Sequence, residues 1–188
     1  MENNRRIKVT KQLLLDALID LLQEKSIENI SIRELTSYAD INRSTFYSHY
    51  NTIYDLLDNL TEQYMSKVVF HSQQHDLLMR EQIEILEYMK LHKKAYLALI
   101  KTDKFLEYLI NKSLTLFDNN QLSYRMLKKE CKDAYEMLVQ YSCAGSVQIL
   151  YLFLENRLQL SAPELAKLLY DVEESIYKVL IHYQNNII

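Results

Sequence analysis

The chain has 188 residues, of which 48% are hydrophobic, so it can fold around a sizeable core and a disordered tail is excluded. It holds one glycine, Gly145, and one proline, Pro163, which nearly excludes an all-β protein and favours an all-α fold with short loops. The net charge of −3 excludes no partner, because residues 90–132 carry +6 while residues 51–89 carry −5, and phosphate attraction depends on local charge.

Apolar residues recur at helical spacing from Leu14 to Leu22, which predicts a first helix from a cap at Thr10 to about Glu24. The residues before and at the start of this helix are locally basic, because they contain several basic side chains and a single acidic one, Glu2. These cations are Arg5, Arg6, Lys8 and Lys11.

Three further helices are expected before residue 72. A capping box of Ser31 and Glu34 opens the second, a turn over 39–41 follows, and Asn42 caps a short third helix over 43–49. Asn51 or Thr52 caps the fourth, which spans about 53–71.

Helical periodicity continues to the end of the chain. The predicted helices cover 79–92, 94–101, 103–117 and 123–158. Ser161 and Glu164 form a second capping box that opens the last helix, with Pro163 in its first turn, where the missing N–H costs nothing.

Residues 31–50 have the layout of a helix-turn-helix, whose second helix enters the DNA major groove. Its exposed face would carry Arg43, Ser44 and Tyr47, which suit base edges or phosphates, while Phe46 and Tyr50 pack inward. From periodicity alone, a three-helix bundle with a solvated Arg43 explains the segment equally well.

The order Ile32-Arg-Glu-Leu-x-x-x-Ala-x-Ile-x-Arg-Ser-Thr-Phe-Tyr-x-His-Tyr50, followed by Tyr54-Asp-Leu-Leu, closely resembles the DNA-binding domain of TetR/AcrR-family transcriptional regulators. The resemblance implies a three-helix DNA-binding domain, a linking fourth helix and a larger helical domain for effector binding and dimerisation. It divides the chain into domains 1–52 and 53–188. The DNA-contacting positions that it implies are Arg33, Asn42, Arg43, Ser44, Thr45, Tyr47, His49 and Tyr50.

Two positions depart from the family pattern. Asp40 stands where glycine is usual in the turn, and aspartate tolerates the left-handed conformation. Ile53 stands where a phosphate-binding lysine often begins the fourth helix, so that contact is absent unless Asn51, Thr52 or Tyr54 replaces it.

The C-terminal part is similar to a Firmicutes-type subgroup that includes regulators related to the dihydroxyacetone-kinase activator. The similar segments are Leu86-Glu-Tyr-x-x-x-His-Lys-Lys-x-Tyr-x-Ala-Leu and the stretch from Gly145 to Ser161-Ala-Pro-Glu-Leu. The family resemblance favours a homodimer formed by the last two helices of each subunit. An intramolecular helix contact is the other explanation for Gly145, which costs a helix about 1 kcal/mol relative to alanine. The expected interface residues are Ser142, Gly145, Ile149, Leu152, Leu169, Val172, Ile176 and Val179.

An effector pocket is the least defined expectation. Tyrosines offer an apolar face and a hydroxyl, and the candidates are Tyr64, Tyr88, Tyr96, Tyr108, Tyr135 and Tyr141, although tyrosines at helical spacing also serve as core residues. The basic block 90–132 would attract an anionic effector or a protein, or form a solvated face. His71 and His75 have the spacing of a metal pair but no third ligand, and no metal or other cofactor is expected.

No apolar run approaches the ~18 residues of a membrane span and no signal segment opens the chain, so a cytoplasmic protein without membrane contact is expected. Cys131 and Cys143 are interpreted as core residues, with a redox-sensing pair as the alternative. The sequence holds no phosphate loop or nucleophile elbow, so an enzyme is not expected. The leading hypothesis is a regulator, most often a repressor in this family, that binds a palindromic operator as a dimer and is released by a small molecule. The alternative is a regulator without a small-molecule ligand that responds to a protein partner through its C-terminal domain.

Overall fold

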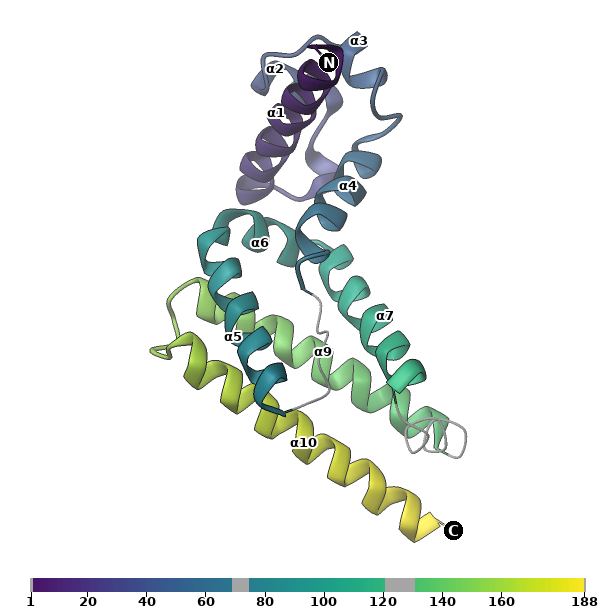
Figure 1. The fold of residues 1–188 in the computed structure, drawn as a ribbon. Coiled ribbons are helices and arrows are strands. Elements are labelled where there is room, and N and C mark those ends of the chain that lie inside the picture. Colours follow the sequence, from purple (N-terminus) through teal and green to yellow (C-terminus); the bar gives the residue numbers. More distant parts are fainter. Residues whose placement is uncertain (1, 69–74, 121–130, 188) are drawn as a thin grey trace. The chain divides into compact units, whose positions relative to one another are not determined.

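The computed structural model describes residues 2–68, 75–120 and 131–187, and within these ranges all regular structure is helical (Figure 1). The predicted all-α fold is therefore confirmed. The helices divide into two compact units, residues 1–69 with 92–105 and residues 70–91 with 106–188. The predicted functional boundary at residue 52 stays a prediction, because compactness does not show where DNA binding ends.

The first unit holds a bundle in which α1 packs against α2, α4 and α6, and α2 contacts α3. Its long apolar residues are almost fully buried, including Leu14, Leu18, Leu35 and Leu56. The elements are α1 (Glu2–Glu24), the short 3₁₀ turn η1 (Ile27–Asn29), α2 (Ile32–Tyr38), α3 (Arg43–Tyr47), α4 (Ile53–Met65) and α6 (Lys93–Ile100).

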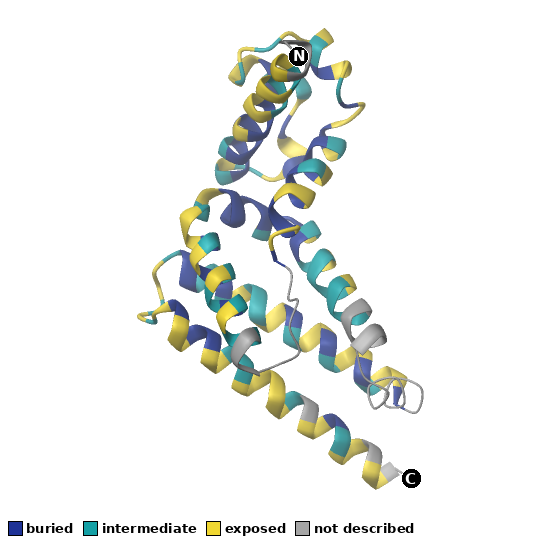
Figure 2. Cartoon of the chain, in the orientation of Figure 1, coloured by how far each residue is buried: buried dark blue, intermediate teal, exposed yellow. Residues whose placement is uncertain are grey.

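Helix α1 corrects the predicted start at Thr10, because it begins eight residues earlier at Glu2. No glycine or proline interrupts residues 2–9, so nothing in that segment stops the helix from extending toward the N-terminus. The extension carries the basic residues of the N-terminus, and its side chains from Arg5 to Val9 are exposed or half-buried (Figure 2).

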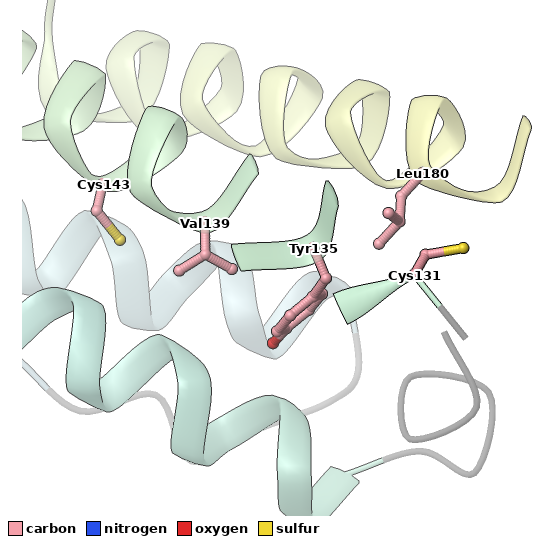
Figure 3. Close-up of a cluster of buried hydrophobic side chains, with 5 residues drawn as sticks. All are labelled: Cys131, Tyr135, Val139, Cys143 and Leu180. Carbon is pink, nitrogen blue, oxygen red and sulfur yellow. The ribbon is translucent and has the colours of Figure 1, made fainter. Parts of the chain in front are cut away.

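In the second unit, α10 packs against α5 and α9. The unit contains α5 (His75–Leu91), most of α7 (Asp103–Asn120), α9 (Lys132–Leu154) and α10 (Ala162–Ile187). One core cluster joins Tyr135, Val139 and Cys143 of α9 to Leu180 of α10, with Cys131 at the start of α9 (Figure 3). Leucines of α7 pack against the same cluster.

The capping box at the start of α10 is present as predicted. The Glu164 carboxylate accepts hydrogen bonds from the backbone N–H of Ser161 at 2.8 Å and from its hydroxyl at 2.6 Å, while the Glu164 N–H donates to the Ser161 hydroxyl at 3.4 Å. The part of the predicted helix 123–158 that covers 123–130 lies outside the described residues.

Helix α9 corrects the expectation that no segment is apolar enough to cross a bilayer. Over the described residues it is the one helix with that length and composition, and 28% of its apolar window is buried within the chain. Length and composition alone do not separate a membrane span from a helix that packs against protein. In its first half, the buried residues Tyr135, Val139 and Cys143 pack against α7 and α10, which is how one face of an amphipathic helix is buried in a protein core.

Candidate DNA-binding surface

The turn between α2 and α3 takes the conformation that the sequence requires. Asp40 lies in the left-handed region, with φ 53°, and the backbone N–H of Ile41 donates to the Thr36 carbonyl at 2.9 Å. The prediction that aspartate replaces glycine here is confirmed. The bond to Thr36 closes the end of α2, so the chain reverses directly into α3.

The capping box predicted at Ser31 is only half formed. The Ser31 hydroxyl accepts from the Glu34 N–H at 3.1 Å, but the Glu34 carboxylate binds the Lys25 ammonium instead of returning to Ser31. The helix start is as predicted, and the glutamate ties α2 to the segment that follows α1.

Two aromatic rings hold α3 in the first unit. Phe46 is fully buried, Tyr50 is 6% exposed, and their ring centroids lie 5.7 Å apart. The Tyr50 hydroxyl donates to the Asn59 side chain on α4 at 2.8 Å. Helix α3 ends at Tyr47, two residues before the predicted end, because the backbone tightens into turns at Ser48 and His49.

The opposite side of α3 is exposed and polar. Arg43, Ser44 and Tyr47 face solvent, and Tyr47 rests edge-on against the Phe46 ring with centroids 5.5 Å apart. The Asn42 side chain is exposed and accepts no capping bond, although the residue occupies the N-cap position.

The remaining predicted contact residues surround this face. Thr45 and His49 are half-buried, and Arg33 on the preceding helix α2 is exposed. Tyr50 differs from the others, since its ring is buried and its hydroxyl is bound within the unit. The predicted DNA contact of Tyr50 stays a prediction, and its visible role is to position α3 against α4.

At the start of α4, a core residue stands where the resemblance implies a lysine. Ile53 is 8% exposed and packs into the core. Thr52 and Asp55 form a full capping box, and the Asp55 carboxylate accepts from the backbone N–H groups of Asn51 at 2.8 Å and Thr52 at 3.2 Å. These hydrogen bonds, that from the Asn51 backbone first, lower the pKa of Asp55.

The basic block 90–132 is largely engaged in internal contacts. Lys94 pairs with Asp20, Lys104 with Asp58, and Lys101 donates to the Gln23 carbonyl at 2.8 Å, all within the first unit. In the second unit, the Lys90 ammonium lies 4.5 Å from the Phe153 ring centroid. Arg125, Lys128 and Lys129 lie outside the described residues.

The six candidate ligand tyrosines are divided between the two units. Tyr64 and Tyr96 belong to the first unit, where the Tyr96 hydroxyl donates to the Tyr64 carbonyl at 2.9 Å. In the second unit Tyr135 is 2% exposed, Tyr141 is 72% exposed, and Tyr88 and Tyr108 are half-buried. The predicted ligand contacts of these tyrosines stay predictions.

The predicted dimer residues lie on α9 and α10 of the second unit, where each is exposed or half-buried within the described part of the chain. Gly145, Val172 and Val179 are exposed, and the described residues offer no atom within 4 Å of a Cβ built on Gly145. The dimer contact and the intramolecular contact both stay predictions for this glycine. The other predicted residues are half-buried, namely Ser142, Ile149, Leu152, Leu169 and Ile176.

Two ionisable groups of the second unit have raised pKa values. Protein around the Glu173 carboxyl on α10 desolvates it and raises its pKa to about 7, although the residue keeps exposed surface. Burial raises the pKa of the Cys143 thiol, which lies 3.5 Å from the Ser113 hydroxyl. A raised pKa keeps a thiol protonated and unreactive, so Cys143 fits the core interpretation better than redox sensing.

Metal-ligating side chains do not cluster among the described residues, where no group of three or more His, Cys, Asp or Glu is placed to hold an ion. Of the suggested pair, His71 and the side chain of His75 lie outside the described part of the chain.

Comparison with known proteins agrees with this geometry. Residues 14–60 match the family model of bacterial regulatory proteins of the tetR family. Over 69 residues the chain is 32% identical to an uncharacterized HTH-type transcriptional regulator, YxbF, of Bacillus subtilis (strain 168). That alignment covers 36% of this chain and 18% of the relative, so the chain spans less than a fifth of that protein. The matched segment 14–60 includes the helix-turn-helix and most of α4, and over this segment the chain is similar to the tetR family.

Proposed function

We propose that the chain is a DNA-binding transcriptional regulator of the TetR family that acts as a cytoplasmic repressor. It binds a palindromic operator as a homodimer and leaves it when a small molecule binds the second unit. The observation that carries the proposal is the exposed polar face of α3, with Arg43, Ser44 and Tyr47, supported on buried Phe46 within the segment that matches the family.

The chemistry of that face suits a major groove. Arg43 can donate two hydrogen bonds to a guanine edge, and Ser44 and Asn42 can bond base edges or phosphates. A single five-residue helix offers few such contacts, so a second copy at the adjacent half-site is needed for specific binding.

Dimerisation through α9 and α10 is supported by their uncovered apolar residues. Leu168, Val172 and Val179 of α10 are each at least half exposed, and Gly145 of α9 has space beside it that a partner helix can enter. Exposed apolar patches of this kind mark interaction surfaces.

Release by an effector is a shift between two populations of the dimer. Helix α7 begins in the first unit and continues into the second, so a ligand that repositions α7 in the second unit would also displace its first turn. Phe105 in that turn packs on Tyr96, with ring centroids 6.4 Å apart. The subgroup likeness of the C-terminal part adds no chemical detail, so the effector's class stays open in this proposal.

The test is selection of DNA fragments bound by the full chain from a genomic library, followed by titration of the selected duplex. The Arg43→Ala, Tyr47→Ala double variant should lose sequence-specific binding, because each good base contact contributes about 1–3 kcal/mol. Lys178→Ala, on the second unit, serves as a control and should bind as the unchanged protein does. Specific binding that survives the double variant would contradict the proposal.

A further inference from the structure

The helix-turn-helix and the following helix are poor in cations. Between Ser31 and Ser66 the sequence has two, Arg33 and Arg43, and acidic residues outnumber them. Duplex DNA is bound largely through cations that neutralise phosphates, and each such cation adds to affinity and to its salt dependence. A DNA-binding face on this unit therefore needs cations from outside residues 31–66.

The N-terminus of α4 is not such a source. Its backbone N–H groups and positive dipole end would ordinarily attract a phosphate, but the Asp55 carboxylate already accepts bonds from Asn51 and Thr52 there. A fixed negative charge at this position repels the DNA backbone.

Several lysines of the same unit are also neutralised within it. Lys25 pairs with Glu34, Lys94 with Asp20 and Lys104 with Asp58. Each ion pair uses the charge that a phosphate contact would need.

The extended start of α1 offers cations beside the recognition helix. The Lys11 ammonium lies 5.6 Å from the centroid of the ring of Tyr50, which follows α3 by three residues. Arg5 and Lys8 are exposed at the same end of the helix. Residues three apart on a helix are surface neighbours, so Arg5, Lys8 and Lys11 follow one another along consecutive turns.

The C-terminal end of α1 contacts α6 and the residue that follows it. The Gln23 side chain donates to the Lys94 carbonyl on α6 at 3.1 Å, and the Gln23 carbonyl accepts from Lys101. The basic N-terminal end of α1 is thus the end that lies nearest α3. A helix rises about 1.5 Å per residue, so this end is roughly 14 Å long from Lys11 to Glu2.

From this placement we infer that the first three turns of α1 form a second phosphate-binding element, in which Arg5, Lys8 and Lys11 bind the DNA backbone flanking the groove that α3 enters. The inference rests on the proposed function. It assigns to α1 the backbone contacts that Ile53 and the Asp55 cap leave missing at α4.

The experiment measures how affinity depends on salt for the full-length chain, with a non-palindromic duplex of mixed sequence titrated at increasing KCl. The variant Arg5→Gln, Lys8→Gln should flatten the slope of log affinity against log salt by about 0.9 for each phosphate that the variant no longer neutralises. The control Lys167→Gln, Lys178→Gln makes the same charge change on α10, where both lysines pair with acids one helical turn away, and should keep the slope.

A charge-retaining variant, Arg5→Lys with Lys8→Arg, should restore the slope, which separates a phosphate contact from a requirement for folding. An unchanged slope in the Gln variant, together with weaker binding by Arg43→Ala, overturns the role of α1 and leaves the proposed function intact. Absence of duplex binding by the unaltered chain overturns both. If the Gln variant loses a binding to anionic vesicles that the unaltered chain has, while its slope with DNA is unchanged, the basic turns contact a membrane surface. That outcome overturns the inference.

Discussion

The two units differ in how far the chain satisfies its own apolar surface. In the first unit, Phe46, Leu35 and Leu56 are fully buried, and the exposed face of α3 is largely polar. In the second unit, α9 and α10 keep Met137, Tyr141 and Val172 more than half exposed. The first unit therefore presents a polar face on α3, whereas the second exposes apolar side chains on α9 and α10.

Charges placed on the uncovered faces should have the largest effect. Val172→Glu with Val179→Glu should convert the proposed dimer into a monomer, because each ion buried in an apolar interface costs several kcal/mol. Sedimentation velocity measures the change. Lys167→Glu, on the charged side of α10, is the control, and a dimer that persists in the double variant would place the interface elsewhere.

A cavity in the first unit should come next. Phe46→Ala should lower the free energy of unfolding by about 3–5 kcal/mol, because it removes a fully buried ring. Leu91→Ala, at a side chain that is 78% exposed, should change it by less than about 0.5 kcal/mol. Urea denaturation followed by circular dichroism measures both, and equal costs would show that the two burial environments do not differ as described.

Substitutions at the two cap positions Thr52 and Asn42 should separate an effect on stability from an effect on DNA binding. Thr52→Ala should cost about 1 kcal/mol of stability, because it removes the hydroxyl that accepts from the Asp55 N–H. Asn42→Ala, at a cap position without a side-chain bond, should leave the urea midpoint nearly unchanged and weaken DNA binding. If Asn42→Ala lowers the urea midpoint and leaves DNA binding unchanged, Asn42 is a structural cap and not part of the DNA-binding face.

The smallest expected effect is on how the stability of the fold depends on pH. Since the pKa of Glu173 is raised from 4.5 to about 7, the folded chain holds a proton that the unfolded chain releases between these values. Stability should therefore fall as pH rises through this window, and Glu173→Gln should reduce that fall. Glu174→Gln, whose carboxylate pairs with Lys178 at 3.2 Å, is the control in thermal melts at pH 5 and pH 8. An equal pH dependence in both variants would contradict the assignment.

Local signals in the sequence predicted the helix-turn-helix closely. The caps at Ser31, Thr52 and Ser161 and the left-handed turn at Asp40 depend on residues within a few positions of one another, so they can be recognised without the fold. The sequence predicts the start of α1 too late because the first turns of this helix are mainly polar and carry no apolar stripe.

Long-range contacts could not be predicted in the same way. Glu34 leaves its capping box for Lys25, and Tyr50 turns its hydroxyl to Asn59, because partners brought close by folding compete with local ones. The six tyrosines look alike in the sequence, yet Tyr96 is buried and Tyr141 is exposed.

The sequence by itself determined the helical fold, the position of the recognition helix and its polar residues, because hydrophobic period and capping act over a few residues. Only the tertiary structure decided which cations stay available to DNA. Pairing of Lys25, Lys94 and Lys104 and the placement of Lys11 beside Tyr50 join residues distant in the chain, and charges interact through space rather than along the sequence.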